Sequence, residues 1–88
     1  MNRIRTPLQL GEALRAARKH LGLTQSRLAL AAGVGLRFIV DLEAGKPTLR
    51  LENVLRVIET LGGEINLSGL PAPGTGDVTI DSTHGSSA

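Results

Sequence analysis

The chain contains no cysteine, no tryptophan and no tyrosine, and its single aromatic residue is Phe38. Without cysteine, neither a disulfide framework nor a thiolate zinc site can stabilise the domain. One aromatic residue also argues against binding single-stranded nucleic acid, which usually recruits several stacking rings, so packing at the edge of the core is the simpler role for Phe38. The longest apolar run, residues 28–36, is too short to span a bilayer. We therefore expect a small cytoplasmic domain with no membrane partner, for which oligomerisation is the remaining source of extra stability.

The sequence also lacks the usual residue patterns of catalysis and metal binding. Its two histidines, His20 and His84, are far apart, and no carboxylates cluster at ligand spacing. The glycine pairs around residues 33–35 and 74–76 are too short to be phosphate loops. We therefore expect no enzymatic activity, no metal and no cofactor.

Charge is distributed unevenly along the 88 residues, although the net charge is only +2. Residues 1–50 hold nine lysines and arginines against three acids, whereas residues 51–88 hold one arginine against five acids. A basic first half suits a polyanionic partner, but it is also compatible with an ordinary solvated surface.

Two helices are predicted in the first third of the chain, with a short break between them. Thr6, Pro7 and Gln9 have the spacing of a capping box with proline at the first helical position, and Gly22 ends the helix that follows. The apolar positions of this helix are Leu10, Leu14, Ala17 and Leu21. Thr24 caps the second helix, and Gly33 ends it, because a positive φ costs glycine little.

A third helix is predicted from about Gly35 to Ala44, with Ile39 and Leu42 facing inward and Arg37 facing outward. Gly45 ends it. Thr48 then caps a fourth helix with a clear apolar face, formed by Leu51, Val54, Leu55, Ile58 and Leu61. The second and third helices have only a glycine-centred turn between them, so they must cross at a steep angle, as in a helix-turn-helix unit.

Residues 64–68 alternate between polar and apolar side chains, which predicts a strand. Its partner is either the segment at residues 3–5 or the same strand of a second copy. Ile65 and Leu67 lie on one face of the strand and are candidates for a dimer interface, the alternative being packing onto the fourth helix. We expect residues 1–70 to form the folded domain and residues 71–88, rich in Gly, Ser, Thr and Pro, to form a flexible tail.

The spacing of the second and third helices resembles the Cro/lambda-repressor type of helix-turn-helix, the XRE family. The resemblance covers roughly residues 8–61 and rests on Thr24, Gln25, Leu28, Ala29, Gly33, Val34, Ile39, Glu43 and Gly45. With residues 36–47 and the strand included, the chain looks most like the HipB-like antitoxins. The resemblance implies a mainly α-helical, lambda-repressor-like bundle of four to five helices with a short C-terminal strand paired across a dimer.

The resemblance also implies double-stranded operator DNA as partner, a homodimer, a location at the nucleoid and possible pairing with a HipA-like kinase toxin. Outward positions at the start of the third helix would face the bases: Gly35, Leu36, Arg37 and Val40. Arg37 is the best candidate for a base contact, because a guanidinium bonds bidentately to guanine O6 and N7. Many relatives carry polar residues where this chain has Gly35, Leu36 and Val40, so hydrogen-bonded readout would be sparse and readout of DNA shape would contribute more.

Five further residues are candidates for contacts to the DNA backbone: Thr24, Gln25, Arg27, Lys46 and Thr48. Gln25 would sit beside the outward N–H groups of the first turn of the second helix, where a phosphate can bind. Lys46 and Thr48 would act with the start of the fourth helix. Arg18 and Glu43 match a partly buried ion pair of the family, and we expect that pair to be structural.

Two other functions remain open from the sequence alone. One is a protein-interaction module that mainly neutralises or scaffolds a partner through the acidic second half. The other is a stand-alone repressor of the phage or plasmid type.

Overall fold

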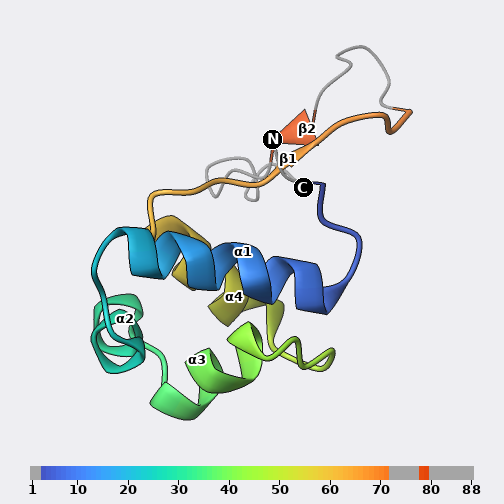
Figure 1. Ribbon diagram of the computed structural model, residues 1–88. Coiled ribbons are helices and arrows are strands. Elements are labelled where there is room, and N and C mark those ends of the chain that lie inside the picture. The colour runs from blue at the N-terminus through green and yellow to red at the C-terminus, as the bar shows by residue number, and fades with distance from the viewer. Residues whose placement is uncertain (1–2, 72–77, 80–88) are drawn as a thin grey trace.

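The computed structural model describes residues 3–71 and 78–79, and four helices make up most of this part of the chain (Figure 1). They are α1 (Pro7–His20), α2 (Gln25–Ala32), α3 (Leu36–Glu43) and α4 (Leu51–Thr60), and they precede two short strands, β1 (Asn66–Leu67) and β2 (Val78–Thr79). In Figure 1, α1 runs across the view while α2 is seen almost along its axis. The predicted mainly helical class is confirmed. No helix of the described residues has the length and apolar character needed to cross a membrane.

Local signals in the sequence set the helix ends. The Thr6 hydroxyl accepts a hydrogen bond from the Gln9 N–H at 3.1 Å, and the Gln9 side chain accepts one from the Arg5 N–H at 2.6 Å. These reciprocal bonds form the predicted capping box, shifted by one residue at its outer bond. Thr24 caps α2 in the same way, accepting from the Arg27 N–H at 3.1 Å.

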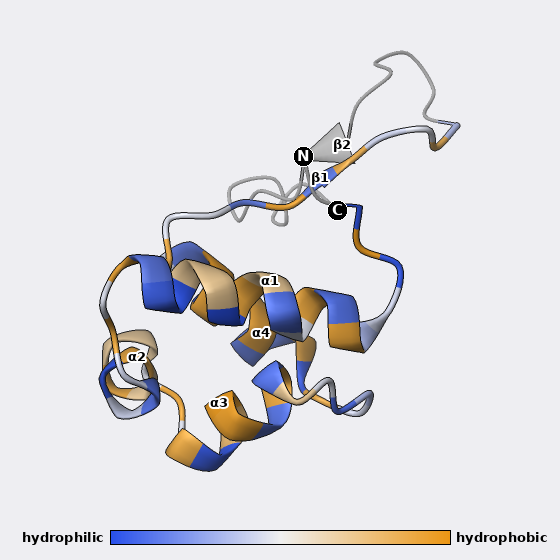
Figure 2. Cartoon of the chain, viewed as in Figure 1, coloured by the Kyte–Doolittle hydropathy of each residue, from blue (hydrophilic) through white to orange (hydrophobic). Residues whose placement is uncertain are grey.

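The core lies between the helices, where their apolar sides face one another (Figure 2). Its most deeply buried side chains come from three helices and are Leu28, Ile39 and Val57. Ile39 and Leu42 face inward as predicted, and Phe38 packs at the edge of the core.

Two positions that were predicted to be buried are exposed. Leu21, which lies past the last turn of α1, is 52% exposed, and Leu51, the first residue of α4, is 64% exposed. Val57, absent from the predicted face of α4, is fully buried instead.

The predicted strand is shorter than expected and pairs within the chain. β1 is antiparallel to β2, with Asn66 opposite Thr79 and Leu67 opposite Val78. The partner within the chain is therefore a segment assigned to the tail, and not residues 3–5 as the sequence suggested. Pairing with a second copy stays a prediction. The rest of that predicted tail, residues 72–77 and 80–88, lies outside the described residues.

The two candidate interface residues have different environments. Ile65 precedes β1 and packs partly against the core, which is the alternative that the sequence left open. Leu67 is 38% exposed. Ile65 therefore contributes to the fold of one subunit, whereas Leu67 remains accessible on this strand.

Candidate nucleic-acid interface

α2 and α3 are joined by only three residues, Gly33, Val34 and Gly35. Gly33 has φ +72°, which glycine adopts readily, and its N–H and that of Val34 bond to carbonyls in the last turn of α2. Val34 packs partly into the core. The turn is thus fixed from both sides, and it holds α3 at a steep angle to α2 in the helix-turn-helix arrangement (Figure 1).

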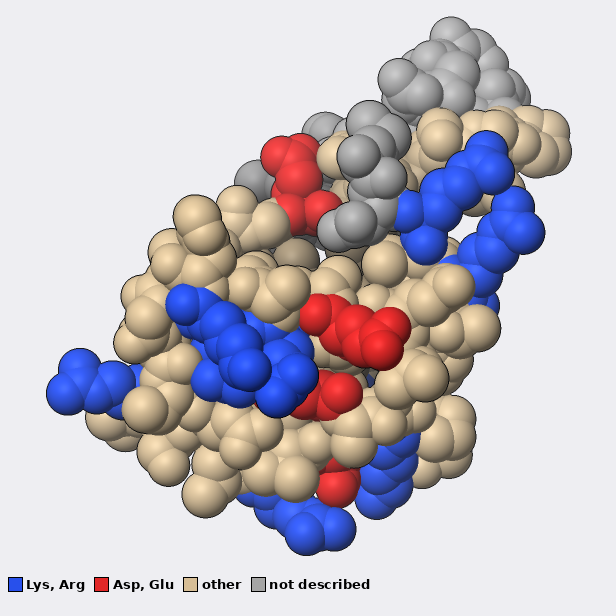
Figure 3. Space-filling model, viewed as in Figure 1, with Lys and Arg blue, Asp and Glu red and all other residues tan. Residues whose placement is uncertain are grey.

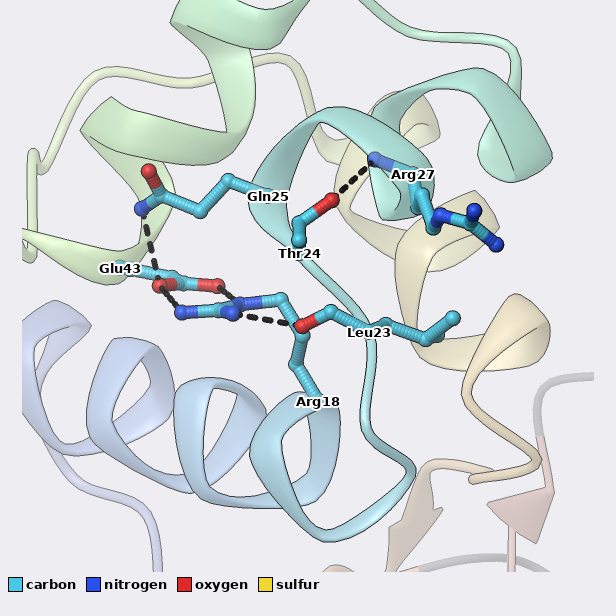
Figure 4. A network of polar contacts seen from close by, with 6 residues as sticks. All are labelled: Arg18, Leu23, Thr24, Gln25, Arg27 and Glu43. Carbon is cyan, nitrogen blue, oxygen red and sulfur yellow. Dashed lines mark hydrogen bonds and ion pairs between the residues drawn. The ribbon is translucent and has the colours of Figure 1, made fainter.

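A buried ion pair connects α1 to the end of α3 (Figure 4). The Arg18 Nε donates to Glu43 Oε2 at 2.6 Å, and its Nη2 donates to Oε1 at 3.0 Å. The third donor, Nη1, bonds to the Leu23 carbonyl at 2.8 Å, just before α2 begins. The structure thus places the two predicted partners in bidentate contact, and the same guanidinium fixes the segment between α1 and α2.

Gln25 also belongs to this network, a contact that the sequence analysis missed. Its Nε2 donates to Glu43 Oε1 at 3.1 Å, although the residue was expected only to bind the DNA backbone. The two roles are compatible, because a carboxamide nitrogen carries two hydrogens and Glu43 uses one of them. The contact orients the Gln25 side chain at the first position of α2 (Figure 4). The sequence alone did not indicate this contact, because it depends on how α2 is placed against α3.

Two opposing effects act on the pKa of Glu43. Burial raises the pKa, but hydrogen bonds from Arg18 and Gln25 and the positive charges of Arg18 and Arg15 outweigh burial, so the pKa lies below its ordinary value. The hydrogen bond to Glu43 raises the pKa of Arg18, against the opposing effect of burial. Both groups are therefore held in their charged forms.

We expect the ion pair to make stability depend on acid pH. Because the folded-state pKa of Glu43 is lowered, its stabilising contribution is fully present above the ordinary value of 4.5 and is lost as pH falls through the lower, folded-state value. Urea unfolding from about pH 7 to about pH 3 measures this loss. Glu43→Gln should flatten the decline below pH 4.5, whereas Glu12→Gln, at an exposed acid of α1, should leave it close to that of the wild type. Equal declines in all three proteins would contradict the prediction.

The outward side of α3 combines exposed apolar groups with a small charged cluster. Leu36 is 47% exposed and Val40 is half-buried, so these two can offer only apolar contacts. Arg37 projects outward, with its side chain 85% exposed. It is not isolated, because its Nε lies 3.2 Å from Asp41 Oδ1, one helical turn away. Figure 2 shows that most of α3 is hydrophobic, with hydrophilic residues in between.

Lys46 belongs to the same cluster, whereas the prediction that Thr48 caps the fourth helix is wrong. The Lys46 Nζ lies 3.6 Å from Asp41 Oδ2. Thr48 is exposed in the loop after α3 and does not cap α4, which begins at Leu51 with Arg50 at the capping position. The start of α4 is displaced because Leu49 packs partly against the core in the segment before the helix.

Exposed cations lie on both helices of the helix-turn-helix unit and after it. Arg27 is exposed on α2, one turn from Thr24, and Arg37 and Lys46 are exposed at and after α3. Figure 3 shows blue and red side chains side by side over α3 and the segment that follows it. Within residues 3–71 and 78–79 no three His, Asp or Glu side chains gather as metal ligands would.

Comparison with known proteins gives consistent matches. Residues 14–67 match the HTH_3 helix-turn-helix family. An uncharacterized HTH-type transcriptional regulator, y4mF of Sinorhizobium fredii, is 55% identical over 65 residues, which cover 74% of this chain and 86% of that protein.

Several solved structures have the same fold. A HipB–O1–O2 complex is similar with a TM-score of 0.71 and 27% identity, covering 76% of this chain and 97% of that one. A HipA–HipB–O2–O3 complex is similar with a TM-score of 0.73 and 25% identity, covering 81% and 100%. The restriction-modification controller protein C.AhdI of Aeromonas hydrophila has a TM-score of 0.61 and 29% identity, covering 66% and 88%.

Proposed function

The chain belongs to the HTH_3, or XRE-type, helix-turn-helix family and is a DNA-binding transcriptional regulator, not an enzyme; from this premise we propose that it is a dimeric repressor of its own operon and the antitoxin of a HipA/HipB-like module. The observation that carries the antitoxin part is the extent of the similarity to HipB. Nearly the whole length of the HipB chains is covered, beyond the helix-turn-helix alone.

In the proposed complex α3 enters the major groove and the first turn of α2 lies against the DNA backbone. Arg37 reads a base edge, while Leu36 and Val40 contact apolar groups such as thymine methyls. Gln25, fixed by Glu43, and the free N–H groups at the start of α2 bind a phosphate. In a dimer, two copies of α3 would meet successive major grooves about 34–36 Å apart on a palindromic operator.

Fluorescence anisotropy with a labelled duplex from the promoter upstream of this gene tests DNA binding directly. Because each subunit would neutralise several phosphates, affinity should fall steeply between about 50 and about 200 mM salt. A duplex of the same composition in scrambled order is the matched control. Binding that is absent, or equal on both duplexes, would overturn the proposal of a sequence-specific repressor.

Arg37→Ala is expected to relax base specificity at one position of each half-site. A bidentate arginine–guanine contact discriminates by about 1–3 kcal/mol, so the preference for that base should fall by roughly five- to 150-fold. A set of duplexes with single substitutions across one half-site measures this preference. Arg27→Ala, at an exposed cation of α2, is the comparison, because a phosphate contact weakens binding to every sequence alike. Uniform loss with Arg37→Ala would mark Arg37 as another phosphate contact.

The antitoxin role is tested by the neighbouring gene and by co-purification. A HipA-like kinase encoded beside this chain should bind it, and binding should survive removal of Arg37 and Lys46, which face the DNA. Absence of both gene and partner would leave a stand-alone repressor. A partner that binds while DNA does not would instead favour an interaction module.

The dimer is tested by the mass of the protein in solution. A chain that ends at Gly63 lacks both β1 and β2, and it should become monomeric if this region joins two subunits. A truncated protein that remains dimeric would place the interface on the helices.

A further inference from the structure

We propose that Asp41 is a positioning residue that sets the specificity of DNA binding by holding Arg37 and Lys46 and by weakening contacts with non-cognate DNA. The inference rests on the proposed DNA-binding mode. Asp41 lies in α3, the helix that would enter the DNA groove, where positive charge would be expected.

The geometry gives Asp41 two cationic neighbours. Its Oδ1 lies 3.2 Å from the Arg37 Nε, and its Oδ2 lies 3.6 Å from the Lys46 Nζ. The Asp41 side chain is only 17% exposed, whereas those of Arg37 and Lys46 are 85% and 49% exposed. The carboxylate therefore lies beneath the two cations and is shared between them, and both charged groups remain accessible to a ligand.

The ion pair also affects how Arg37 can be used. The arginine atom that approaches Asp41 is Nε, whereas recognition of guanine O6 and N7 can use the two terminal Nη groups. A carboxylate at Nε restrains the guanidinium while a base edge is read at its end. A side chain so restrained loses less conformational freedom on binding than a free arginine does.

The same carboxylate acts against binding by charge alone. Arg37, Lys46 and Asp41 together carry a charge of +1, and removal of the acid would raise it to +2. The other acid of α3, Glu43, is buried and paired with Arg18, so Asp41 is the acid of this helix that a phosphate backbone would meet. Non-specific binding consists almost entirely of such phosphate contacts, so Asp41 opposes it most directly.

Asp41→Asn tests the proposal, because asparagine keeps the size of the side chain and removes its charge. Affinity for the scrambled duplex should rise on the order of five- to tenfold. When the logarithm of this affinity is plotted against the logarithm of the salt concentration, the slope should become steeper by about one. Affinity for the promoter duplex should change less, so the ratio of the two affinities should fall by a similar factor. Glu59→Gln, at an exposed acid in the last turn of α4, makes the same change in net charge on a different helix.

Other results of the Asp41→Asn experiment would each point to a different explanation. If Glu59→Gln produces the same changes, net charge explains the result and the proposal is overturned. If Asp41→Asn weakens binding to both duplexes equally, with a lowered unfolding temperature, Asp41 only supports the fold. In the Arg37→Ala background, Asp41→Asn should no longer alter the preference among bases. Failure of the wild-type protein to bind either duplex would instead refute the proposed function.

Discussion

Arg18→Met is expected to destabilise the domain by about 3–5 kcal/mol, whereas Arg18→Met combined with Glu43→Leu should cost much less than twice that amount. The single substitution leaves a carboxylate whose side chain is only 4% exposed, with one hydrogen bond from Gln25 in place of three. A buried charge without its counter-ion retains its full desolvation penalty. Removal of both charges eliminates that penalty.

The double variant should still be less stable than the wild type. The Leu23 carbonyl loses its bond from Arg18 Nη1, and the Gln25 carboxamide loses its acceptor. A lost hydrogen bond of this kind costs about 0.5–1.5 kcal/mol. Urea unfolding followed by circular dichroism, for the wild type, both single variants and the double variant, gives the coupling energy directly. Strictly additive effects would contradict the structural role of the pair.

The pH dependence of Arg18→Met offers a second and independent check. Once the arginine is gone, burial becomes the main effect and raises the pKa of Glu43 above its ordinary value. Protonation in the folded state is then favourable, so the deficit of the variant relative to the wild type should shrink as pH falls. The sign is opposite to that of the wild-type ion pair, whose contribution declines in acid.

The sequence predicts this ion pair and the helix ends better than it predicts contacts between distant segments. Thr6, Thr24 and Gly33 determine their local backbone through hydrogen bonds or a positive φ within a few residues, so the pattern is sufficient. Arg18 and Glu43 were paired through a family resemblance. The bond of Gln25 to Glu43 depends on how α2 is placed against α3, which no spacing along the chain specifies.

Errors in the predicted core and strand have similar causes. Periodicity along α4 does not reveal which of its apolar positions the neighbouring helices cover, so Val57 was missed and exposed Leu51 was included. The partner of β1 is a two-residue segment, Val78–Thr79, in a region whose composition is that of a tail. A strand this short has no detectable alternation of its own.

Gly11→Ala is expected to lower the free energy of unfolding by about 2–3 kcal/mol, although it adds only one methyl group. Gly11 is buried in α1 where that helix crosses the end of α3. A Cβ at this position would lie 2.3 Å from the Leu42 carbonyl oxygen and 3.0 Å from that of Glu43. Both contacts are to backbone, so no side-chain rotation relieves them and α3 itself has to move.

Intrinsic helix propensity acts in the opposite direction and sharpens this test, since alanine in a helix interior is favoured over glycine by about 1 kcal/mol. Gly35→Ala is the control, because a Cβ there meets nothing within 4 Å and should change stability by less than about 1 kcal/mol. A shift of α3 away from α1 would also lengthen the bonds between Arg18 and Glu43. The coupling energy of that pair should therefore fall in the Gly11→Ala background, and promoter binding should weaken with it. If Gly11→Ala instead stabilises the protein, α1 and α3 do not approach as closely as this structure places them.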